Sequence, residues 1–159
     1  LLVDAMIAQS ESETRALWAI RDDVVQLRRD GDPVGFDISL PVSRMDDYVR
    51  EVERRLEALP IKSLLYVFGH LGDGNLHVVV AVPGGFTPDL NHGIETAAYA
   101  PLQARGGSVS AEHGIGLDKK PWLPVSRTEP ELAVMRAIKR ALDPRGLLNP
   151  GKILDLPGG

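Results

Sequence analysis

Two of the four histidines lie at the ends of one glycine-rich segment, Gly69-His70-Leu71-Gly72-Asp73-Gly74-Asn75-Leu76-His77. An imidazole nitrogen is a good ligand for a divalent metal, and glycines let the backbone fold closely around a bound ion. If the segment is the turn of a hairpin, its paired strands hold His70 and His77 close together. The segment therefore predicts a metal site, although the same residues would also suit a turn whose histidines bind nothing.

A second segment, Ser108-Val109-Ser110-Ala111-Glu112-His113-Gly114-Ile115-Gly116, places an acid beside a histidine in a glycine-flanked loop. Neighbouring side chains point in different directions, so Glu112 could bind a metal while His113 faces a substrate. Two imidazoles and one carboxylate form a three-ligand set that leaves one coordination position open. Alone, this loop would be interpreted as a helix cap or a surface loop. Beside the histidine segment, the catalytic interpretation is favoured.

Two further segments carry weaker signals. Asn149-Pro150-Gly151-Lys152-Ile153 is, as sequence, only a turn. Trp18-Ala19-Ile20-Arg21 belongs to a helical stretch, where an arginine is usually solvated. The planar guanidinium of Arg21 would nevertheless suit a substrate carboxylate.

The composition restricts the class of protein. A chain of 159 residues with 43% hydrophobic content is sufficient for one domain, and the 5% aromatic content means that aliphatic side chains build most of its core. The net charge of −4 provides no basic face for nucleic acid. The absence of cysteine excludes disulfides, thiolate metal sites, iron–sulfur clusters and cysteine nucleophiles.

No apolar run approaches the roughly 20 residues that a membrane-spanning helix needs. The sequence opens with Leu1-Leu2-Val3-Asp4, without an initiator methionine or a signal-peptide pattern. We therefore expect a cytoplasmic protein of which this chain is one piece.

Hydrophobic spacing predicts the elements that position these segments. Leu17, Ile20, Val24 and Leu27 recur at helical spacing within residues 10–29, with Ser12 and Thr14 available for capping at the start. Alternation of apolar and small or polar residues predicts a strand over residues 34–40. Ser43 is expected to cap a second helix, whose core-facing residues would be Met45, Tyr48, Val49, Val52 and Leu56.

The remainder of the chain predicts a hairpin and two more helices. Two β-branched runs, 63–69 and 76–82, flank the histidine segment as hairpin strands. A third helix over 88–105, a short strand over 108–110 and a last helix over 129–142 complete the order. Because hairpin strands are antiparallel, these elements predict an α+β fold with helices on one face of an antiparallel sheet.

Taken together, the hairpin, the Ser110–Gly116 loop and the Asn149–Lys152 turn resemble the C-terminal domain of the FAD-linked oxidase family. That family includes D-lactate dehydrogenases, glycolate oxidase subunits and D-2-hydroxyglutarate dehydrogenases. The likeness runs from about residue 17 to 153, with the motifs in family order. It implies a ferredoxin-like substrate domain that covers a flavin, with FAD bound mainly by an N-terminal domain of the vanillyl-alcohol-oxidase type that this chain does not contain.

The resemblance also implies roles for individual residues. The family's metal ligands match His70, His77 and Glu112, with zinc or manganese as the expected ion. His113 matches the proposed base, and Arg21 matches the arginine that holds the substrate carboxylate; both would line the substrate site together with His70 and His77. Asn149 and Lys152 match the terminal motif beside the flavin. The implied reaction oxidises a 2-hydroxyacid to a 2-oxoacid, with hydride transfer to FAD and an unidentified electron acceptor.

One departure from the family bears on the substrate. Relatives acting on 2-hydroxyglutarate tend to have aromatic-Lys-aromatic-Asp where this chain has Val34-Gly35-Phe36-Asp37, and polar residues where it has Val25 and Val79. A second carboxylate buried against Gly35 and the two valines would cost several kcal/mol. We therefore expect a monocarboxylic hydroxyacid with an apolar tail.

Two other functions stay open at this point. One is a stand-alone metal- or ligand-binding module without redox activity, and the other is a structural ferredoxin-like interaction domain. If the flavoenzyme interpretation holds, the isolated chain should be inactive, and a homodimer is one form that the whole protein could take.

Overall fold

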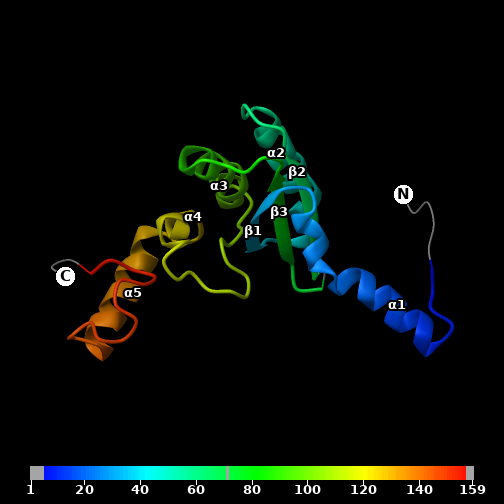
Figure 1. The fold of residues 1–159 in the computed structure, drawn as a ribbon. Coiled ribbons are helices and arrows are strands. Elements are labelled where there is room, and N and C mark those ends of the chain that lie inside the picture. Colours follow the sequence, from blue (N-terminus) through cyan, green and yellow to red (C-terminus); the bar gives the residue numbers. More distant parts are fainter. Residues whose placement is uncertain (1–5, 71, 157–159) are drawn as a thin grey trace.

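The chain forms a small antiparallel sheet with two helices on one face and two helical arms that extend away from it (Figure 1). The computed structural model describes residues 6–70 and 72–156. Its three strands are β1 (Asp32–Ser39), β2 (Leu64–His70) and β3 (Asn75–Val82), in the order β1-β3-β2. β3 pairs antiparallel with both neighbours. The α+β fold predicted from the sequence is confirmed.

The helices are α1 (Glu11–Asp22), η1 (Val24–Arg28), η2 (Val42–Arg44), α2 (Met45–Glu57), α3 (Pro88–Gln103), η3 (Lys120–Trp122), α4 (Leu123–Ser126) and α5 (Glu129–Leu142), where η marks a 3-10 helix. From β1 to α3 the chain follows the strand-helix-strand-strand-helix order of ferredoxin-like folds. The strand expected over residues 108–110 is reduced to one antiparallel bridge between Ser39 and Ser108. This bridge lies on β1, at the edge of the sheet where a fourth strand would pair.

One face of the sheet forms the core with α2 and α3. Alternate residues of the strands point to this face, and Ile38, Val78 and Val80 are fully buried there. Tyr48 of α2 is also fully buried, and its hydroxyl donates a 2.8 Å hydrogen bond to the backbone oxygen of Ala98 in α3. The two helices are therefore fixed to each other as well as to the sheet.

The opposite face of the sheet carries the candidate site residues. Strand alternation places Gly35 and Asp37 of β1 on this face, opposite Val79 and His77 of β3 in the strand register. On this face η1 contacts β1 and β3.

The first helix is shorter than predicted. Its expected span of 10–29 is broken at Asp23, whose backbone (φ −79°, ψ 63°) leaves the helical region before η1 begins. Ser10, rather than Ser12 or Thr14, caps α1, because its side chain accepts a 3.2 Å hydrogen bond from the backbone N–H of Glu13.

The start of α2 also differs from the prediction. Ser43 lies inside η2, where the backbone N–H of Arg44 bonds to the oxygen of Pro41 at 2.8 Å. This turn makes Arg44 the N-cap of α2, and no side chain caps that end. The expected capping by Ser43 is therefore wrong, because the chain makes one 3-10 turn between the proline and the helix.

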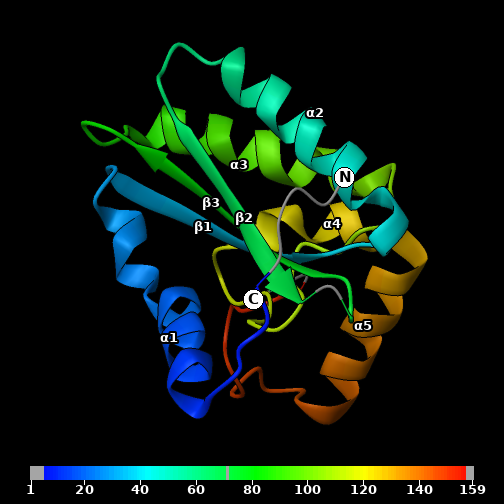
Figure 2. The same ribbon diagram turned by 90° about the vertical axis from the view of Figure 1, so that its right-hand side faces the viewer.

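The arms α1 and α5 project from the body on either side of the site (Figures 1 and 2). Both present large apolar side chains to solvent: Trp18 and Ile20 of α1 are 56% and 71% exposed, and Val134 and Ile138 of α5 are 58% and 53% exposed. Helical spacing in the sequence thus did not indicate packing within this chain. Within the described ranges, no helix combines the length and apolarity needed to cross a bilayer.

Candidate functional site

The backbone is packed so closely around the turn between β2 and β3 that neither Gly69 at the end of β2 nor Gly74 in the turn can be replaced without a clash. Gly69 has φ +152°, and a Cβ there would lie 2.3 Å from the backbone oxygen of Asn75. Gly74 has φ +76°, and a Cβ there would lie 2.5 Å from the oxygen of Leu40. The backbone N–H of Leu40 bonds to the oxygen of Gly74 at 3.0 Å, so the turn is also fixed to the end of β1.

Three histidines gather at this end of the sheet. The ring of His77 is 5.7 Å from that of His70, at 88°, and 6.0 Å from that of His113, at 26°, measured between centroids. Phe68 of β2 lies on the same side, 5.3 Å from His77. The fourth histidine, His92, is elsewhere, stacked on Trp122. The hairpin and the 108–116 loop therefore bring together the histidines that the sequence singled out.

Glu112 lies beside His70. Its Oε1 is 3.1 Å from Nδ1 of His70 and accepts a 2.8 Å hydrogen bond from Nδ2 of Asn75. Oδ2 of Asp73 is 3.8 Å from the same His70 nitrogen. Among the described residues, possible ligand atoms of His70, Asp73 and Glu112 all lie within 4.8 Å of one another. His77 is adjacent to this group, and its role as a ligand stays a prediction.

These residues suit a divalent cation. Imidazole nitrogen and carboxylate oxygen are ligands that zinc accepts, and manganese also accepts carboxylates. The neighbouring side chain of Asn75 is 2% exposed, and its Oδ1 has no hydrogen-bond partner in the described part of the chain. A buried polar atom without a partner is uncommon and is often explained by an ion or a water molecule.

The loop that carries Glu112 and His113 is held by a buried carboxylate. Oδ2 of Asp37 accepts hydrogen bonds from the backbone N–H groups of Ala111 (3.2 Å), Glu112 (2.9 Å) and His113 (2.8 Å). Burial would raise the pKa of Asp37. The N–H groups of His113 and Glu112 and the charge of Lys119 outweigh burial and bring that pKa to about 2. Asp37 is therefore charged at neutral pH.

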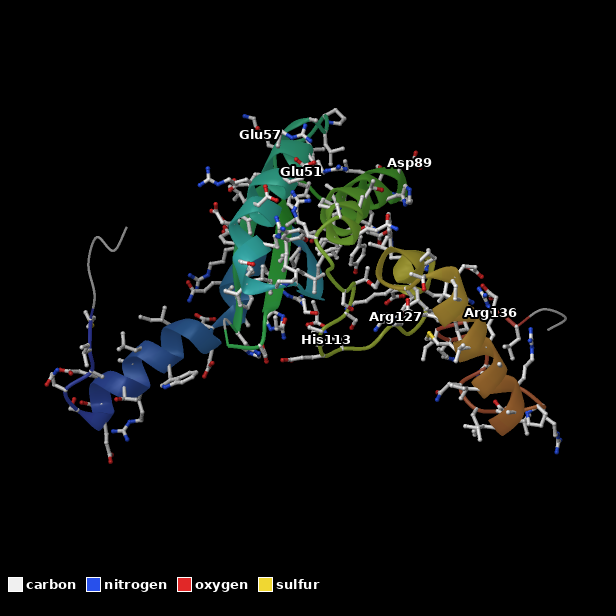
Figure 3. All side chains as sticks on the ribbon, turned by 180° about the vertical axis from the view of Figure 1, so that it is seen from behind. Glu51, Glu57, Asp89, His113, Arg127 and Arg136 are labelled. Carbon is white, nitrogen blue, oxygen red and sulfur yellow. The ribbon has the colours of Figure 1, made fainter. Side chains whose placement is uncertain are left out.

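His113 itself is accessible. Its side chain is 65% exposed, with Nδ1 3.8 Å from Oδ2 of Asp37. Figure 3 shows it on the loop between the two arms. An exposed imidazole with one nitrogen near a carboxylate can exchange a proton with a ligand through its other nitrogen.

A cavity of about 420 Å³ opens on this face of the sheet. Apart from His77, His113, Asp37 and Lys119, it is lined by Leu27, Gly35, Phe36, Phe68 and Val79. A neighbouring cavity of about 520 Å³ shares Leu27 and Phe68 with it. Of the three positions expected beside the substrate tail, Gly35 and Val79 line the cavity. Val25 does not: it is 67% exposed, and Leu27 of the same 3-10 helix lines the cavity in its place.

For the remaining predicted site residues, the structure shows no direct contact with the histidines among the described side chains. Arg21 belongs to α1, but its side chain lies outside the described residues. Asn149 and Lys152 are exposed on the terminal turn. This turn is tied to the His113 loop, since the backbone N–H of Ile153 bonds to the oxygen of Gly116 at 2.9 Å. The cofactor roles of Asn149 and Lys152 stay predictions.

Sequence reasoning missed four polar residues that contribute to the site. Asp73 and Asn75 lie within the histidine segment, but their types were taken only as turn formers. Asp37 lies between the buried Phe36 and Ile38, and a carboxylate within an apolar strand was the available signal. For Lys119, which lies 3.5 Å from that carboxylate, the sequence contains no local signal.

Comparison with known proteins identifies the family. The family model for the C-terminal domain of FAD linked oxidases matches residues 1–153, so the chain belongs to this family. It is 39% identical to "D-2-hydroxyglutarate dehydrogenase, mitochondrial" of Rattus norvegicus over 97% of this chain and 28% of that protein. It is 39% identical to a D-2-hydroxyglutarate dehydrogenase of Xanthomonas citri pv. viticola, over 96% of this chain and 33% of the relative. It is 35% identical to a putative D-lactate dehydrogenase of Schizosaccharomyces pombe, over 96% of this chain and 31% of the relative. The chain thus spans about a third or less of these relatives.

Proposed function

We propose that this chain is the substrate- and metal-binding domain of an FAD-dependent 2-hydroxyacid dehydrogenase. The observation that carries the proposal is the 3.1 Å approach of His70 to Glu112 beside the rings of His77 and His113. Residues far apart in the sequence supply a ligand group and an adjacent acid–base group on one open face. Relatives named as D-2-hydroxyglutarate and D-lactate dehydrogenases support the same reaction class.

In this proposal His70, His77 and Glu112 hold a zinc or manganese ion. When bound, the ion would act as a Lewis acid that lowers the pKa of the substrate 2-hydroxyl. His113 takes the hydroxyl proton, because its exposed imidazole faces the cavity while Asp37 lies near its Nδ1. Arg21 is proposed to hold the substrate carboxylate. Loss of the hydroxyl proton and of a hydride from C2 leaves the 2-oxoacid.

FAD would accept that hydride, and we propose that a flavin domain of the same protein lies against the open face. The exposed apolar residues Trp18 and Ile20 of α1, and Val134 and Ile138 of α5, lie on arms at either side of the site and suit an interface with such a domain. Asn149 and Lys152 would contact the flavin from the terminal turn. Inactivity of the isolated chain follows as a prediction.

Three features of the whole protein remain predictions: a homodimer, an unidentified electron acceptor and a cytoplasmic location. The name of the rat relative places that protein in mitochondria.

For the substrate, we propose a monocarboxylic hydroxyacid with an apolar tail. Leu27, Phe68 and Val79 line the cavity beside His77 and His113, and no side chain at Gly35 contributes a positive charge. The names of several relatives point instead to 2-hydroxyglutarate, a diacid. The substrate preference of the full-length protein therefore tests this proposal separately from the reaction class.

The test of function compares two histidine variants of the full-length protein. His70→Ala should lower bound zinc or manganese and abolish reduction of the flavin by a 2-hydroxyacid, while FAD remains bound. His92→Ala is the matched control, because His92 is 74% exposed on α3 and stacks on Trp122 away from the site. It should retain both metal and flavin reduction.

Two results would contradict the proposal. Undiminished flavin reduction by His70→Ala would exclude the metal-assisted reaction. Metal binding in the wild type without any flavin reduction, tested with both mono- and dicarboxylic hydroxyacids, would favour a binding module without redox activity.

A further inference from the structure

We propose that Asp37 is a positioning residue, whose buried carboxylate sets the places of Glu112, His113 and His77 at once. The inference rests on the proposed function, because it assigns an organising role within that same site. Asp37 is not proposed to contact the substrate or the metal.

Asp37 belongs to a strand that packs on the hydrophobic core. Its side chain is 1% exposed, and its neighbours in β1, Phe36 and Ile38, are buried in the core on the opposite face of the sheet. A change in the position of Asp37 would therefore require a change in the packed core. Lys119, with a side chain 13% exposed, lies 3.5 Å from Oδ2 of Asp37 and is its partly buried counter-ion.

The ammonium group of Lys119 is engaged in contacts with Asp37 and its loop. Its Nζ donates to the backbone oxygen of Asp37 at 3.1 Å and to Oγ of Ser110 at 3.2 Å, in addition to the ion pair. An ammonium has three N–H donors, so two of them are used in these hydrogen bonds while the charge is paired with Asp37. Lys119 is thus better explained as a support for Asp37 than as a ligand for a second substrate carboxylate.

Oδ2 of Asp37 determines the direction of the loop. It accepts from the consecutive N–H groups of Ala111, Glu112 and His113, at 3.2, 2.9 and 2.8 Å. Three donors converging on one oxygen hold these peptide planes in a single arrangement. Adjacent side chains then diverge, so that Glu112 lies beside His70 while His113 lines the cavity. The loop residues are themselves exposed, so packing alone would not fix them.

Oδ1 of Asp37 is available for His77. It is buried and has no hydrogen-bond partner among the residues that the structure describes. Asp37 and His77 are direct cross-strand partners in the β1–β3 register and line the same cavity. Metal-binding histidines almost always donate their second ring N–H to a carboxylate, a backbone carbonyl or water. The unpartnered oxygen is the acceptor that we assign to the ring of His77 when it binds the ion.

The test uses Asp37→Asn in the full-length protein, with Asp143→Asn as the matched control. Asp143 is also buried, accepts backbone N–H groups of Leu147 and Leu148, and pairs with Lys139 at 2.6 Å. Asp143→Asn therefore removes the same kind of charged hydrogen-bond acceptor, but at a position away from the histidines. The two readouts are hydrogen exchange of the 111–113 amides in metal-free protein and the Kd for Zn²⁺.

For Asp37→Asn we expect faster exchange at the 111–113 amides and a Kd for Zn²⁺ weaker by about 10- to 100-fold, the range typical of outer-shell partners of metal ligands. Asp143→Asn should leave both unchanged. Lys119→Met should reproduce the Asp37 effects in part, and it is the second variant if Asp37→Asn does not fold.

The proposal is overturned if Asp37→Asn keeps both the slow exchange and the wild-type affinity, or if Asp143→Asn weakens Zn²⁺ binding equally. Should the wild type bind no Zn²⁺ or Mn²⁺, the proposed metal function fails. The amide exchange would still decide whether Asp37 holds the loop, because it is measured without metal.

Discussion

Gly35 lines the cavity beside His77 and His113, and replacing it by lysine tests which substrates the cavity selects. The glycine is exposed on the open face of β1, opposite Val79. A Cβ added there would meet no atom within 4 Å, so a side chain can be accommodated without moving the strand. Removing a glycine from a strand interior also lowers the entropy of the unfolded chain. Gly35→Lys should therefore fold and place an ammonium group within reach of a substrate tail.

The size of the expected rise in kcat/KM for a dicarboxylic substrate follows from the charges that line the cavity. Lys119, the one lysine or arginine among the described residues that line this cavity, is already paired with Asp37. A distal carboxylate entering this cavity would lose solvation without gaining a partner. A hydrogen bond to a charged group contributes about 1.5–3 kcal/mol, and each 1.4 kcal/mol is about a factor of ten. Because Gly35 is exposed, the lower end applies, or about a tenfold rise in kcat/KM for the diacid.

The assay measures kcat/KM of the full-length protein for D-2-hydroxyglutarate and D-lactate. We expect the wild type to prefer D-lactate and Gly35→Lys to shift the ratio toward the diacid by about tenfold. Gly35→Met is the matched control, since it adds an unbranched side chain of similar length without the charge. It should not improve the diacid.

Two results would refute the reasoning. A wild type that strongly prefers D-2-hydroxyglutarate would show that another group, such as a residue of the flavin domain, holds the second carboxylate. An unchanged ratio in Gly35→Lys would show that the substrate tail does not reach β1.

Two further predictions concern single polar residues. Asn75→Ala removes the 2.8 Å hydrogen bond to Glu112 and should weaken Zn²⁺ binding by about 10- to 100-fold in a direct titration; an unchanged Kd would show that Glu112 is held by other contacts. Asp143 has a pKa of about 2, held below its usual value of 3.8 by Lys139 and the backbone N–H of Leu148, so its contribution to stability is complete above pH 4 and is lost as the pH falls through this interval. The difference in thermal stability between wild type and Asp143→Asn should accordingly shrink between pH 4 and pH 2, and a difference that grows there would contradict the assigned ion pair.

Most of the fold could be predicted because its core obeys local patterning. Residues of β1 and β3 alternate between a buried face and the site face, and α2 buries Met45, Tyr48, Val52 and Leu56 at helical spacing. The short helices η3 and α4 were not predicted, because segments of three and four residues are too short to show a hydrophobic period. The spacing of Leu17 and Ile20 predicted a helix correctly but not its surroundings. Helical periodicity identifies an apolar face and cannot say which chain covers it.

The site was predictable only where residue type indicated chemistry. Histidines and a neighbouring acid are rare enough to be noticed, whereas Asp37 and Asn75 are types that usually form turns or face solvent. Their importance depends on burial and on contacts with residues 37 and 76 positions away in the sequence. Such long-range contacts depend on where the 108–116 loop lies against the sheet, and no local pattern predicts that.

The two faces of the sheet explain why the site can be both exposed and ordered. Glu112 and His113 belong to a loop that is open to solvent, as the proposed contact with a substrate and a flavin requires. A loop of this kind has little packing of its own, so its order has to come from hydrogen bonds. Asp37 supplies them from a strand whose other face is the core, and the register places it directly opposite His77. The arrangement of the proposed ligands is therefore a consequence of the packing of β1 on the core.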